Sequence, residues 1–259
     1  MIKEIDARLV ALMDDCQNPK LKEAMLYSIQ SGGKRLRPML LLGACEAALG
    51  RYTDAAIEFA CSLEMIHTYS LIHDDLPAMD NDDFRRGMPT SHKKFGEALA
   101  ILAGDALLNR AFQAMAVICA NDPAPPNLGA MNVITAAAGD NGMIAGQVED
   151  INQSTVKNPD KEALFNVYRK KTGALFSAAL SAGAMLGGGD PRYVKVMYDL
   201  GFNLGIAFQI KDDLLDNDGP FSLEEYEQIS AEVLSDFEKI HHKTDTLRTI
   251  VQRVIDRVS

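Results

Sequence analysis

Two aspartate clusters lie far apart in this chain, and each follows an apolar helical stretch. The first is Asp74-Asp75-Leu76-Pro77-Ala78-Met79-Asp80, and the second is Asp212-Asp213-Leu214-Leu215-Asp216. Carboxylates crowded beside apolar residues need cations. With no cysteine or metal-spaced histidine pair nearby, their oxygens suit a hard ion such as Mg²⁺, which usually binds one or two carboxylates, water and substrate phosphates. We therefore interpret the clusters as the two sides of a Mg²⁺ site that binds a pyrophosphate.

The second cluster fits one face of a helix. Residues three and four apart share a helix face, so Asp212 and Asp216 point the same way, with Gln209 and Asp213 beside them. A single acidic triplet more often marks a solvated helix end. Two such clusters, each after an apolar stretch, favour a functional role.

The first cluster needs a break in its helix to work in the same way. Asp74 and Asp80 are six residues apart, which a straight helix would place on opposed faces. Pro77 lies between them, and a proline inside a helix kinks or ends it. We therefore expect the chain to turn at Pro77 and to bring Asp80 back toward Asp74.

One histidine shares the helix face of the first cluster. His67 lies seven residues before Asp74, which is two helical turns or about 10 Å along the axis. A lone histidine on a helix is more often structural than a ligand. Its place on the Asp74 face makes a functional role about as plausible as a structural one.

Basic residues recur in three segments. These are Gly32-Gly33-Lys34-Arg35-Leu36-Arg37-Pro38, Asp83-Phe84-Arg85-Arg86-Gly87 and Tyr168-Arg169-Lys170-Lys171-Thr172-Gly173. The first joins a glycine pair to three cations just before a helix, whose exposed N–H groups add to the attraction for phosphate. A lone basic segment usually lies on the protein surface. Three of them together with two acidic clusters indicate binding sites for two diphosphate groups. One would be held through metal and the other directly by Arg and Lys.

Composition limits the class of protein. The chain has 259 residues, 47% of them hydrophobic, and a formal net charge of −10. No Gly/Ser/Pro-rich linker divides it, so a single domain over residues 1–259 is expected. The acidic balance argues against nucleic acid as a partner, although it does not exclude a diphosphate substrate, since local cations decide that.

The same composition predicts a soluble, cytoplasmic protein. We find no apolar run that we expect to span a bilayer, and the N-terminal residues lack the apolar core of a signal peptide. Four cysteines have no metal-binding spacing. They are expected to be reduced and mostly buried.

The elements that must position these residues are helices, which predicts an all-α fold. Helix formers dominate, and breakers divide the chain into helices at about 2–15, 19–31, 37–49, 53–76, 91–120, 126–140, 142–153, 159–186, 190–216, 222–241 and 244–258. Capping residues support three of the starts: Thr53, Asn158 before Pro159, and Ser222 followed by Glu225.

These motifs together resemble those of the trans-isoprenyl diphosphate synthases, most closely the bacterial short-chain farnesyl diphosphate synthases. The matching stretches are GGKRLRP at 32–38, EMIHTYSLIHDDLPAMDNDDFRRGMPTSHKKFGEALAILAGDALL at 64–108, GQVED at 146–150, YRKKTGALF at 168–176 and GIAFQIKDDLLD at 205–216. The combination is highly specific.

The resemblance implies an isoprenoid synthase helical bundle around a central apolar cavity, usually a homodimer, with the two aspartate motifs facing each other across the cavity mouth. It also implies up to three Mg²⁺ ions bound with a diphosphate. The implied metal ligands are Asp74, Asp75, Asp80, Asp212, Asp213 and Asp216.

The implied activity is a prenyltransferase reaction that joins isopentenyl diphosphate to an allylic diphosphate. The implied catalytic residues, which also contact the allylic diphosphate, are Arg85, Lys171, Thr172 and Gln209. The residues implied to hold isopentenyl diphosphate are Lys34, Arg37, His67 and Arg86. Cations around the leaving pyrophosphate would let the allylic C–O bond ionise to a carbocation, which the double bond of isopentenyl diphosphate attacks.

In the family, residues just upstream of the first aspartate pair limit product length. Tyr69 and Ser70 occupy these positions, and Pro77-Ala78 forms the two-residue insertion seen in bacterial C15 synthases. We therefore expect farnesyl diphosphate as product, with dimethylallyl and geranyl diphosphates as allylic substrates. Tyr69 can also be a plain core aromatic, which leaves geranylgeranyl diphosphate as an alternative product.

One departure from the family pattern follows the second motif. Family members carry there a loop of about two dozen residues, longer than typical connections, with two lysines that close over the allylic diphosphate. Here Asp216-Asn217-Asp218-Gly219-Pro220 leads directly toward the helix near Ser222. Either the lid is absent or a segment is missing from the sequence. Because a lid completes a site and excludes water, its loss predicts weak turnover with substrate binding largely kept.

Two other classes remain open. The first is a non-catalytic, isoprenoid-binding subunit, which the six retained carboxylates disfavour. The second is a terpene cyclase or squalene-type synthase, which would need no isopentenyl diphosphate site such as GGKRLRP with Arg86.

Overall fold

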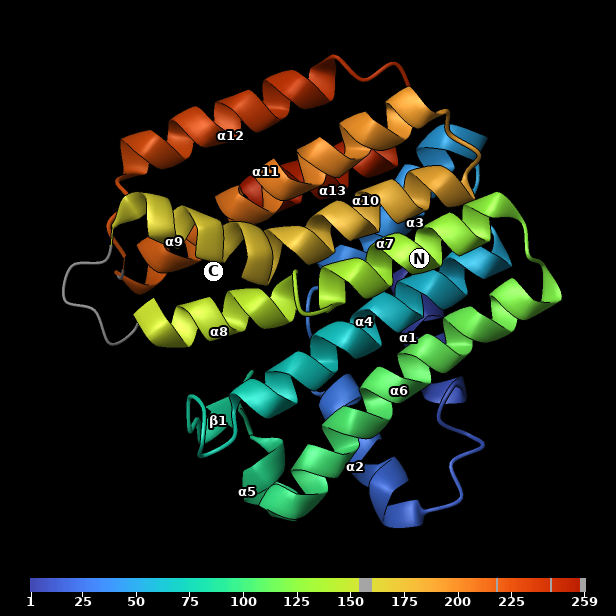
Figure 1. The fold of residues 1–259 in the computed structure, drawn as a ribbon, viewed down its shortest axis with the longest axis vertical. Coiled ribbons are helices and arrows are strands. Elements are labelled where there is room, and N and C mark those ends of the chain that lie inside the picture. Colours follow the sequence, from blue (N-terminus) through green and yellow to red (C-terminus); the bar gives the residue numbers. More distant parts are fainter. Residues whose placement is uncertain (154–159, 218, 243, 257–259) are drawn as a thin grey trace. The chain divides into compact units, whose positions relative to one another are not determined.

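The computed structural model describes residues 1–153, 160–217, 219–242 and 244–256. Its elements are α1 (Ile2–Ala11), α2 (Pro19–Gln30), α3 (Leu36–Leu49), α4 (Asp54–Asp74), β1 (Phe84–Arg85), β2 (Met88–Pro89), α5 (Ser91–Phe95), α6 (Glu97–Asn121), α7 (Pro125–Ala138), α8 (Met143–Gln153), α9 (Lys161–Tyr168), the π-helical segment η1 (Arg169–Gly173), α10 (Ala174–Leu186), α11 (Pro191–Asp216), α12 (Leu223–Glu238) and α13 (Asp245–Ile255). The prediction of an all-α fold is thereby confirmed (Figure 1).

The chain forms two compact units. Residues 1–38 and 57–122 make up unit 1, and residues 39–56 and 123–259 make up unit 2. The predicted isopentenyl diphosphate residues and the first aspartate cluster belong to unit 1, whereas the second aspartate cluster and the lysine-rich segment belong to unit 2. The single domain over 1–259 stays a prediction.

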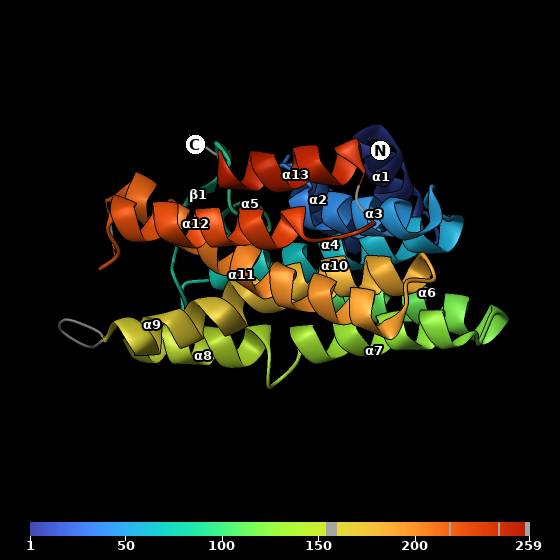
Figure 2. The ribbon, with the colours of Figure 1, turned by 90° about the horizontal axis from the view of Figure 1, so that it is seen from above.

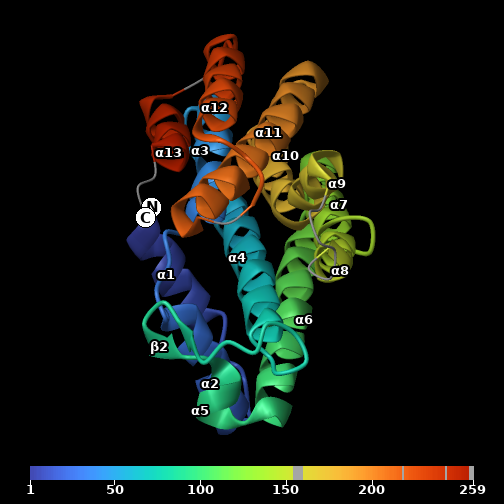
Figure 3. The ribbon, with the colours of Figure 1, turned by 90° about the vertical axis from the view of Figure 1, so that its left-hand side faces the viewer.

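In unit 1, α4 is the central helix. Figure 3 shows α4 between α1 and α6, and α2 also packs against α6. The thiol of Cys61 on α4 lies 3.7 Å from the carbonyl oxygen of Ile5 on α1, and the imidazole Nε2 of His73 lies 3.1 Å from the carbonyl oxygen of Ile101 on α6. Phe59, Cys61 and Leu63 on different sides of α4 are all buried, as expected for a helix that is apolar all round.

In unit 2, α10 is the buried helix. All residues from 174 to 184 are buried, because α7 and α11 both pack against this helix. Figure 2 shows α7 and α8 end to end in one layer, with α12 and α13 on the opposite side of α11. Small residues allow the close packing: a Cβ on Gly201 of α11 would lie 2.3 Å from the Cα of Ser177 on α10.

Four element boundaries differ from the prediction. The first helix ends at Ala11 rather than near residue 15. The expected helix 91–120 is divided at Gly96, whose φ of 85° lies outside the helical region. The expected helix 159–186 contains η1. The residues around Gly87 form a hairpin that pairs Phe84 with Pro89, although only two residues form each strand.

Two of the three predicted helix starts are confirmed. The Thr53 hydroxyl accepts a hydrogen bond from the Ala56 N–H at 3.1 Å, and Ser222 and Glu225 form a reciprocal capping box. The third prediction, at Asn158 and Pro159, lies outside the described residues.

One helix bears on the expectation that no continuous apolar run is long enough to span a bilayer. Among the described residues, α6 is long and apolar enough, by length and composition alone, to cross a membrane. Only 28% of its most apolar window is buried. Such a helix also occurs in proteins whose apolar face is covered by a partner.

Candidate active site

The first aspartate cluster turns as the proline predicts. α4 ends at Asp74, and the backbone N–H of Asp80 donates to the carbonyl oxygen of Asp74 at 2.9 Å. The N–H of Asn81, at a φ of 56°, donates to Leu76 at 3.1 Å. This turn confirms that the chain brings Asp80 back to Asp74.

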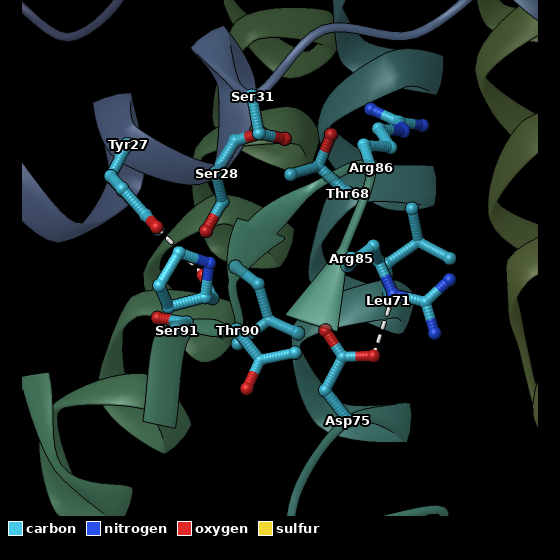
Figure 4. A pocket seen from close by; sticks show the side chains of 12 residues that line it. Tyr27, Ser28, Ser31, Thr68, Leu71, Asp75, Arg85, Arg86, Thr90 and Ser91 are labelled. Atoms are coloured by element: carbon cyan, nitrogen blue, oxygen red, sulfur yellow. Dashed lines mark hydrogen bonds and ion pairs between the residues drawn. The ribbon is translucent and has the colours of Figure 1, made fainter. Parts of the chain in front are cut away.

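Asp75, between these two residues, is engaged by an arginine. Its Oδ1 accepts a hydrogen bond from the Nε of Arg85 at 2.6 Å (Figure 4), and the Asp75 side chain is only 4% exposed. Burial raises the pKa of Asp75, while Arg85 acts in the opposite direction. Arg85 also reaches Asp82 at 3.3 Å. The predicted diphosphate ligand Arg85 is therefore fixed by two carboxylates.

The hairpin β1–β2 positions Arg85 and Arg86. The Tyr27 hydroxyl on α2 donates to the carbonyl oxygen of Pro89 at 2.7 Å, and the Thr90 hydroxyl donates to Asp82 at 2.7 Å. A cavity of about 30 Å³ lies between α2, α4 and the hairpin (Figure 4). It has room for ordered water but not for a substrate.

The Gly32-Gly33 pair packs on Arg86. The Arg86 guanidinium donates to the carbonyl oxygen of Gly32, and a Cβ on Gly33 would lie 2.7 Å from the Arg86 Nη1. Gly33 has a φ of 133°, which other residues rarely adopt. Glycine is therefore needed here both for the backbone conformation and for the approach of the guanidinium.

Arg37 and His67 belong to the same cation cluster. Burial lowers the pKa of Arg37 to about 10, with Glu64 opposing and Arg86 adding to the effect. Burial, followed by Arg37 and Arg86, holds the pKa of His67 well below its ordinary value. The structure thus groups three of the four predicted isopentenyl diphosphate residues, Arg37, His67 and Arg86, with His67 as a neutral imidazole.

Tyr69 and Ser70 lie on α4, one turn before Asp74. Tyr69 is 6% exposed, and burial, together with Asp74, raises its pKa to about 12. Its ring packs edge-on against His73 at 5.6 Å between centroids. A Cβ on Gly104 of α6 would lie 2.2 Å from the His73 Nε2, so Gly104 provides the space in which His73 supports Tyr69. The Ser70 hydroxyl instead donates to the carbonyl oxygen of His67 at 2.9 Å.

In unit 2, close glycine contacts position η1. A Cβ on Gly146 of α8 would lie 2.2 Å from the Lys171 backbone nitrogen, and a Cβ on Gly205 of α11 would lie 2.6 Å from the Cα of Gly173. π-helical turns of this kind often occur at functional sites. The two close contacts present Lys171 and Thr172 from a rigid segment.

Thr172 begins a chain of polar contacts along α11. The Thr172 hydroxyl donates to the Gln209 Oε1 at 2.9 Å, and the Gln209 Nε2 donates to the Asp213 Oδ1 at 3.1 Å. The Tyr168 hydroxyl donates to the other oxygen of Asp213. The structure therefore brings together three residues predicted from the sequence and adds Tyr168, which the sequence reasoning did not assign.

The lysines of η1 have acidic partners on α8. The Lys171 Nζ lies 2.5 Å from the Asp150 Oδ2, and Lys170 forms an ion pair with Glu149. Both acids belong to the GQVED stretch, whose resemblance to the family was the available signal. Partners on another helix cannot be identified from spacing along the chain.

The connection after the second cluster is short. Asn217 ends α11 in the left-handed conformation, with a φ of 54°, and α12 begins at Leu223. The Tyr168 and Phe221 rings lie 5.7 Å apart. Among the described residues of this connection there is no lysine, and the expected loss of the lid stays a prediction.

The carboxylates fit magnesium in their chemistry. No group of three His, Cys, Asp or Glu side chains within the described residues converges tightly enough to hold a metal by itself. Mg²⁺ does not require such a group, because it commonly binds one or two carboxylates and takes its other ligands from water and substrate phosphates. The oxygen-only donors at the ends of α4 and α11 match that preference.

The chain matches a family of known proteins. The polyprenyl synthetase family model matches residues 18–237. The farnesyl diphosphate synthase of Geobacillus stearothermophilus is 46% identical over 218 residues, which are 83% of this chain and 72% of that protein. The geranylgeranyl diphosphate synthase of Cyanophora paradoxa is 45% identical over 194 residues, covering 75% and 64%.

A solved structure shares the fold. The crystal structure of an FPP/GFPP synthase from Zymomonas mobilis, without ligands, aligns with a TM-score of 0.89 at 34% identity. The match covers 98% of this chain and 95% of that one. At this similarity the two chains have the same fold, so the predicted helical bundle is confirmed.

Proposed function

The chain belongs to the polyprenyl synthetase family, and from this membership we propose that it is a prenyltransferase that makes farnesyl diphosphate. It would condense isopentenyl diphosphate with dimethylallyl or geranyl diphosphate. The observation that carries the proposal is the cation cluster of Arg37, His67 and Arg86 beside the Gly32-Gly33 loop. A condensing enzyme needs such a metal-free site for its second diphosphate, whereas a cyclase does not.

Isopentenyl diphosphate would bind this cluster. Lys34, which is exposed on the loop, and the guanidinium groups of Arg37 and Arg86 supply the positive charge. The neutral imidazole of His67 contributes one N–H donor and one acceptor.

The allylic diphosphate would bind Arg85, Lys171, Thr172 and Gln209. Its magnesium ions would be held by Asp74, Asp80, Asp212 and Asp216, and would supply charge neutralisation to the departing pyrophosphate. Asp75 and Asp213, also predicted as ligands, accept hydrogen bonds from Arg85, Gln209 and Tyr168. We assign them the role of orienting those side chains.

The reaction breaks the allylic C1–O bond and forms a bond from C1 to C4 of isopentenyl diphosphate. Arg85 and Lys171 stabilise negative charge on the leaving group, as preorganised donors do where charge develops. Thr172 and Gln209 have lone pairs near the developing cation but are too weakly nucleophilic to trap it. A proton leaves C2 of the isopentenyl unit, and the departing pyrophosphate is a base of suitable strength.

Tyr69 would limit the product to fifteen carbons by blocking the apolar cavity that the family resemblance predicts. The ring is buried and supported by His73. Replacing Tyr69 by Ala is expected to shift the product toward twenty carbons, because the deleted ring leaves space for one more isoprene unit. Chromatography of products made with labelled isopentenyl diphosphate measures the shift, and an unchanged product length would show that Tyr69 is only a core residue.

We further propose a homodimer with a second copy of the chain covering α6. Ile101, Leu102 and Val117 on α6 are 42%, 56% and 52% exposed. Exposed apolar side chains of this kind can mark an interface. The cytoplasmic location, and the absence of membrane insertion and of nucleic-acid binding, remain predictions from the sequence.

Incubation of the purified protein with Mg²⁺, geranyl diphosphate and isopentenyl diphosphate tests the function. Farnesyl diphosphate as product supports the synthase. Retained substrate binding without turnover would favour the non-catalytic subunit, which the short connection after Asp216 keeps as the second candidate. Release of a hydrocarbon would favour a cyclase.

A further inference from the structure

A buried carboxylate lies beneath the cation cluster of unit 1. The Glu64 side chain on α4 is 3% exposed, and its Oε1 lies 2.8 Å from the Nη1 of Arg35. A buried carboxylate is favourable only with a partner of opposite charge.

Arg35 joins Glu64 to the middle of α1 and to the C-terminal end of α2. Its Nη2 donates to the carbonyl oxygen of Ile29 on α2 at 2.6 Å, and its Nε lies 2.9 Å from the Oδ1 of Asp6 on α1. Arg35 has a φ of 49°, an uncommon conformation for a residue other than glycine. These three contacts keep the loop in that conformation.

The same loop presents the diphosphate ligands. Lys34 precedes Arg35, and Arg37 follows it by two residues. The Gly32 carbonyl oxygen accepts from the Arg86 guanidinium and lies 3.5 Å from the Arg35 Nη1. Movement of Arg35 would therefore displace both the loop and the contact of Arg86 with it.

Glu64 also acts electrostatically on the cluster. Its charge raises the pKa of Arg35, Arg37 and Arg86, against the effect of burial on each. His67, one helical turn after Glu64 on α4, carries no compensating charge because its own pKa is lowered. Glu64 thus favours the charged form of all three guanidinium groups, and it pairs directly with Arg35.

We propose that Glu64 is a positioning residue for the isopentenyl diphosphate site: through Arg35 it holds the loop that carries Lys34 and that accepts the hydrogen bond of Arg86. Glu64 does not touch the substrate. This inference rests on the proposed function, because it names the support of that same site.

The test compares Glu64→Gln with Glu58→Gln. The first substitution keeps the shape of the side chain but removes its charge. Glu58 lies on the same helix and pairs with Arg8 at 2.5 Å, so its substitution removes an ion pair that does not contact the cation cluster. Calorimetric titration with isopentenyl diphosphate alone should show at least about a tenfold weaker affinity for Glu64→Gln, the effect of losing one good polar contact. Glu58→Gln should bind as the wild type does.

Steady-state kinetics separate positioning from general damage. For Glu64→Gln, KM for isopentenyl diphosphate should rise while KM for geranyl diphosphate stays within about twofold. Equal rises in both KM values, or an unchanged isopentenyl diphosphate affinity, overturn the inference. If Glu64→Gln does not fold, Asp6→Asn provides the milder test. It removes the charge from the ion pair between Asp6 and Arg35, and the Asp6 side chain is 48% exposed. It should shift the same affinity in the same direction by a smaller factor, and wild-type affinity would overturn the inference.

The two proposals fail differently. A wild-type protein that makes no prenyl product contradicts the proposed function, whatever the variants do. An active wild type whose affinity for isopentenyl diphosphate is unaffected by Glu64→Gln contradicts only the role of Glu64.

Discussion

The second aspartate of each Asp-Asp pair is bound by the protein itself. Asp75 accepts from Arg85, and Asp213 accepts from Gln209 and Tyr168. Carboxylates already engaged in charge-assisted or multiple hydrogen bonds are less available to a cation. We therefore propose that Asp75 and Asp213 orient neighbouring side chains within their motifs.

Asp75→Asn should therefore affect substrate binding more than metal binding. The loss of its charge weakens the anchor of Arg85, so KM for the allylic diphosphate should rise by roughly tenfold. The Mg²⁺ concentration for half-maximal activity should change little. Asp74→Asn serves as the comparison and should raise that Mg²⁺ requirement. Equal Mg²⁺ requirements for the two variants would contradict the division of roles.

His67 should stay neutral at ordinary pH. Burial and the surrounding arginines disfavour the imidazolium and lower its pKa, so a proton is bound only in acid, below that lowered value. Nitrogen NMR of the substrate-free protein should show no titration of His67 between about pH 6 and 8. His67→Gln identifies the resonance. A titration near the ordinary histidine pKa of about 6.5 would refute this assignment.

At the scale of elements, two glycines on α11 allow that helix to approach its neighbours closely: Gly201 faces α10 and Gly205 faces η1. Gly205→Ala would place a Cβ 2.6 Å from the Cα of Gly173. Alanine gains about 1 kcal/mol in a helix, but overpacking costs about 1–3 kcal/mol. We expect a lower Tm and a higher KM for the allylic diphosphate, since Gln209 moves away from Thr172.

Gly129→Ala on α7 is the matched control. Its Cβ would meet only the flexible Met185 side chain, at 3.1 Å, so its Tm should stay close to that of the wild type. Thermal unfolding and steady-state kinetics measure both variants. A Gly205→Ala protein with wild-type Tm and KM would show that α11 tolerates displacement from η1.

Much of the element pattern could be predicted from local residues. Pro77 predicted the turn that joins Asp80 to Asp74, and Ser222 with Glu225 predicted a helix start, because both effects act within a few residues. The break at Gly96 escaped prediction, since helix formers flank it on both sides and a single glycine is tolerated in many helices. The hairpin strands are too short to show alternation.

The ligand residues of the candidate site were proposed through a resemblance, but the side chains that contact them were not. Glu64, Asp150 and Tyr168 act on residues that are distant in sequence or on other helices. Spacing along one helix predicts shared faces but not which helix packs opposite. Likewise, η1 depends on Gly146 and Gly205 from neighbouring helices, and no local pattern marks it.

At the scale of the whole molecule, the exposed apolar surface of α6 predicts self-association. Light scattering should give a mass twice the 28.3 kDa of one chain. Leu102→Glu places a charge on a side chain that is 56% exposed, and it should shift the protein toward monomer because an unpaired charge disfavours a buried interface.

Val148→Glu on α8 controls for added charge, since Val148 is 55% exposed but lies outside the proposed interface. This variant should remain dimeric. A monomeric wild type, or a Leu102→Glu protein that stays dimeric, would contradict the assignment of α6.

Formation of the new carbon–carbon bond tests the central claim most directly. A single-turnover reaction with Mg²⁺, isopentenyl diphosphate and geranyl diphosphate labelled with ¹³C at C1 should yield one fifteen-carbon diphosphate. Carbon NMR should show the labelled carbon bonded to the former C4 of isopentenyl diphosphate, with one pyrophosphate released per product. Pyrophosphate release without that bond, or a labelled hydrocarbon, would contradict the proposed head-to-tail condensation.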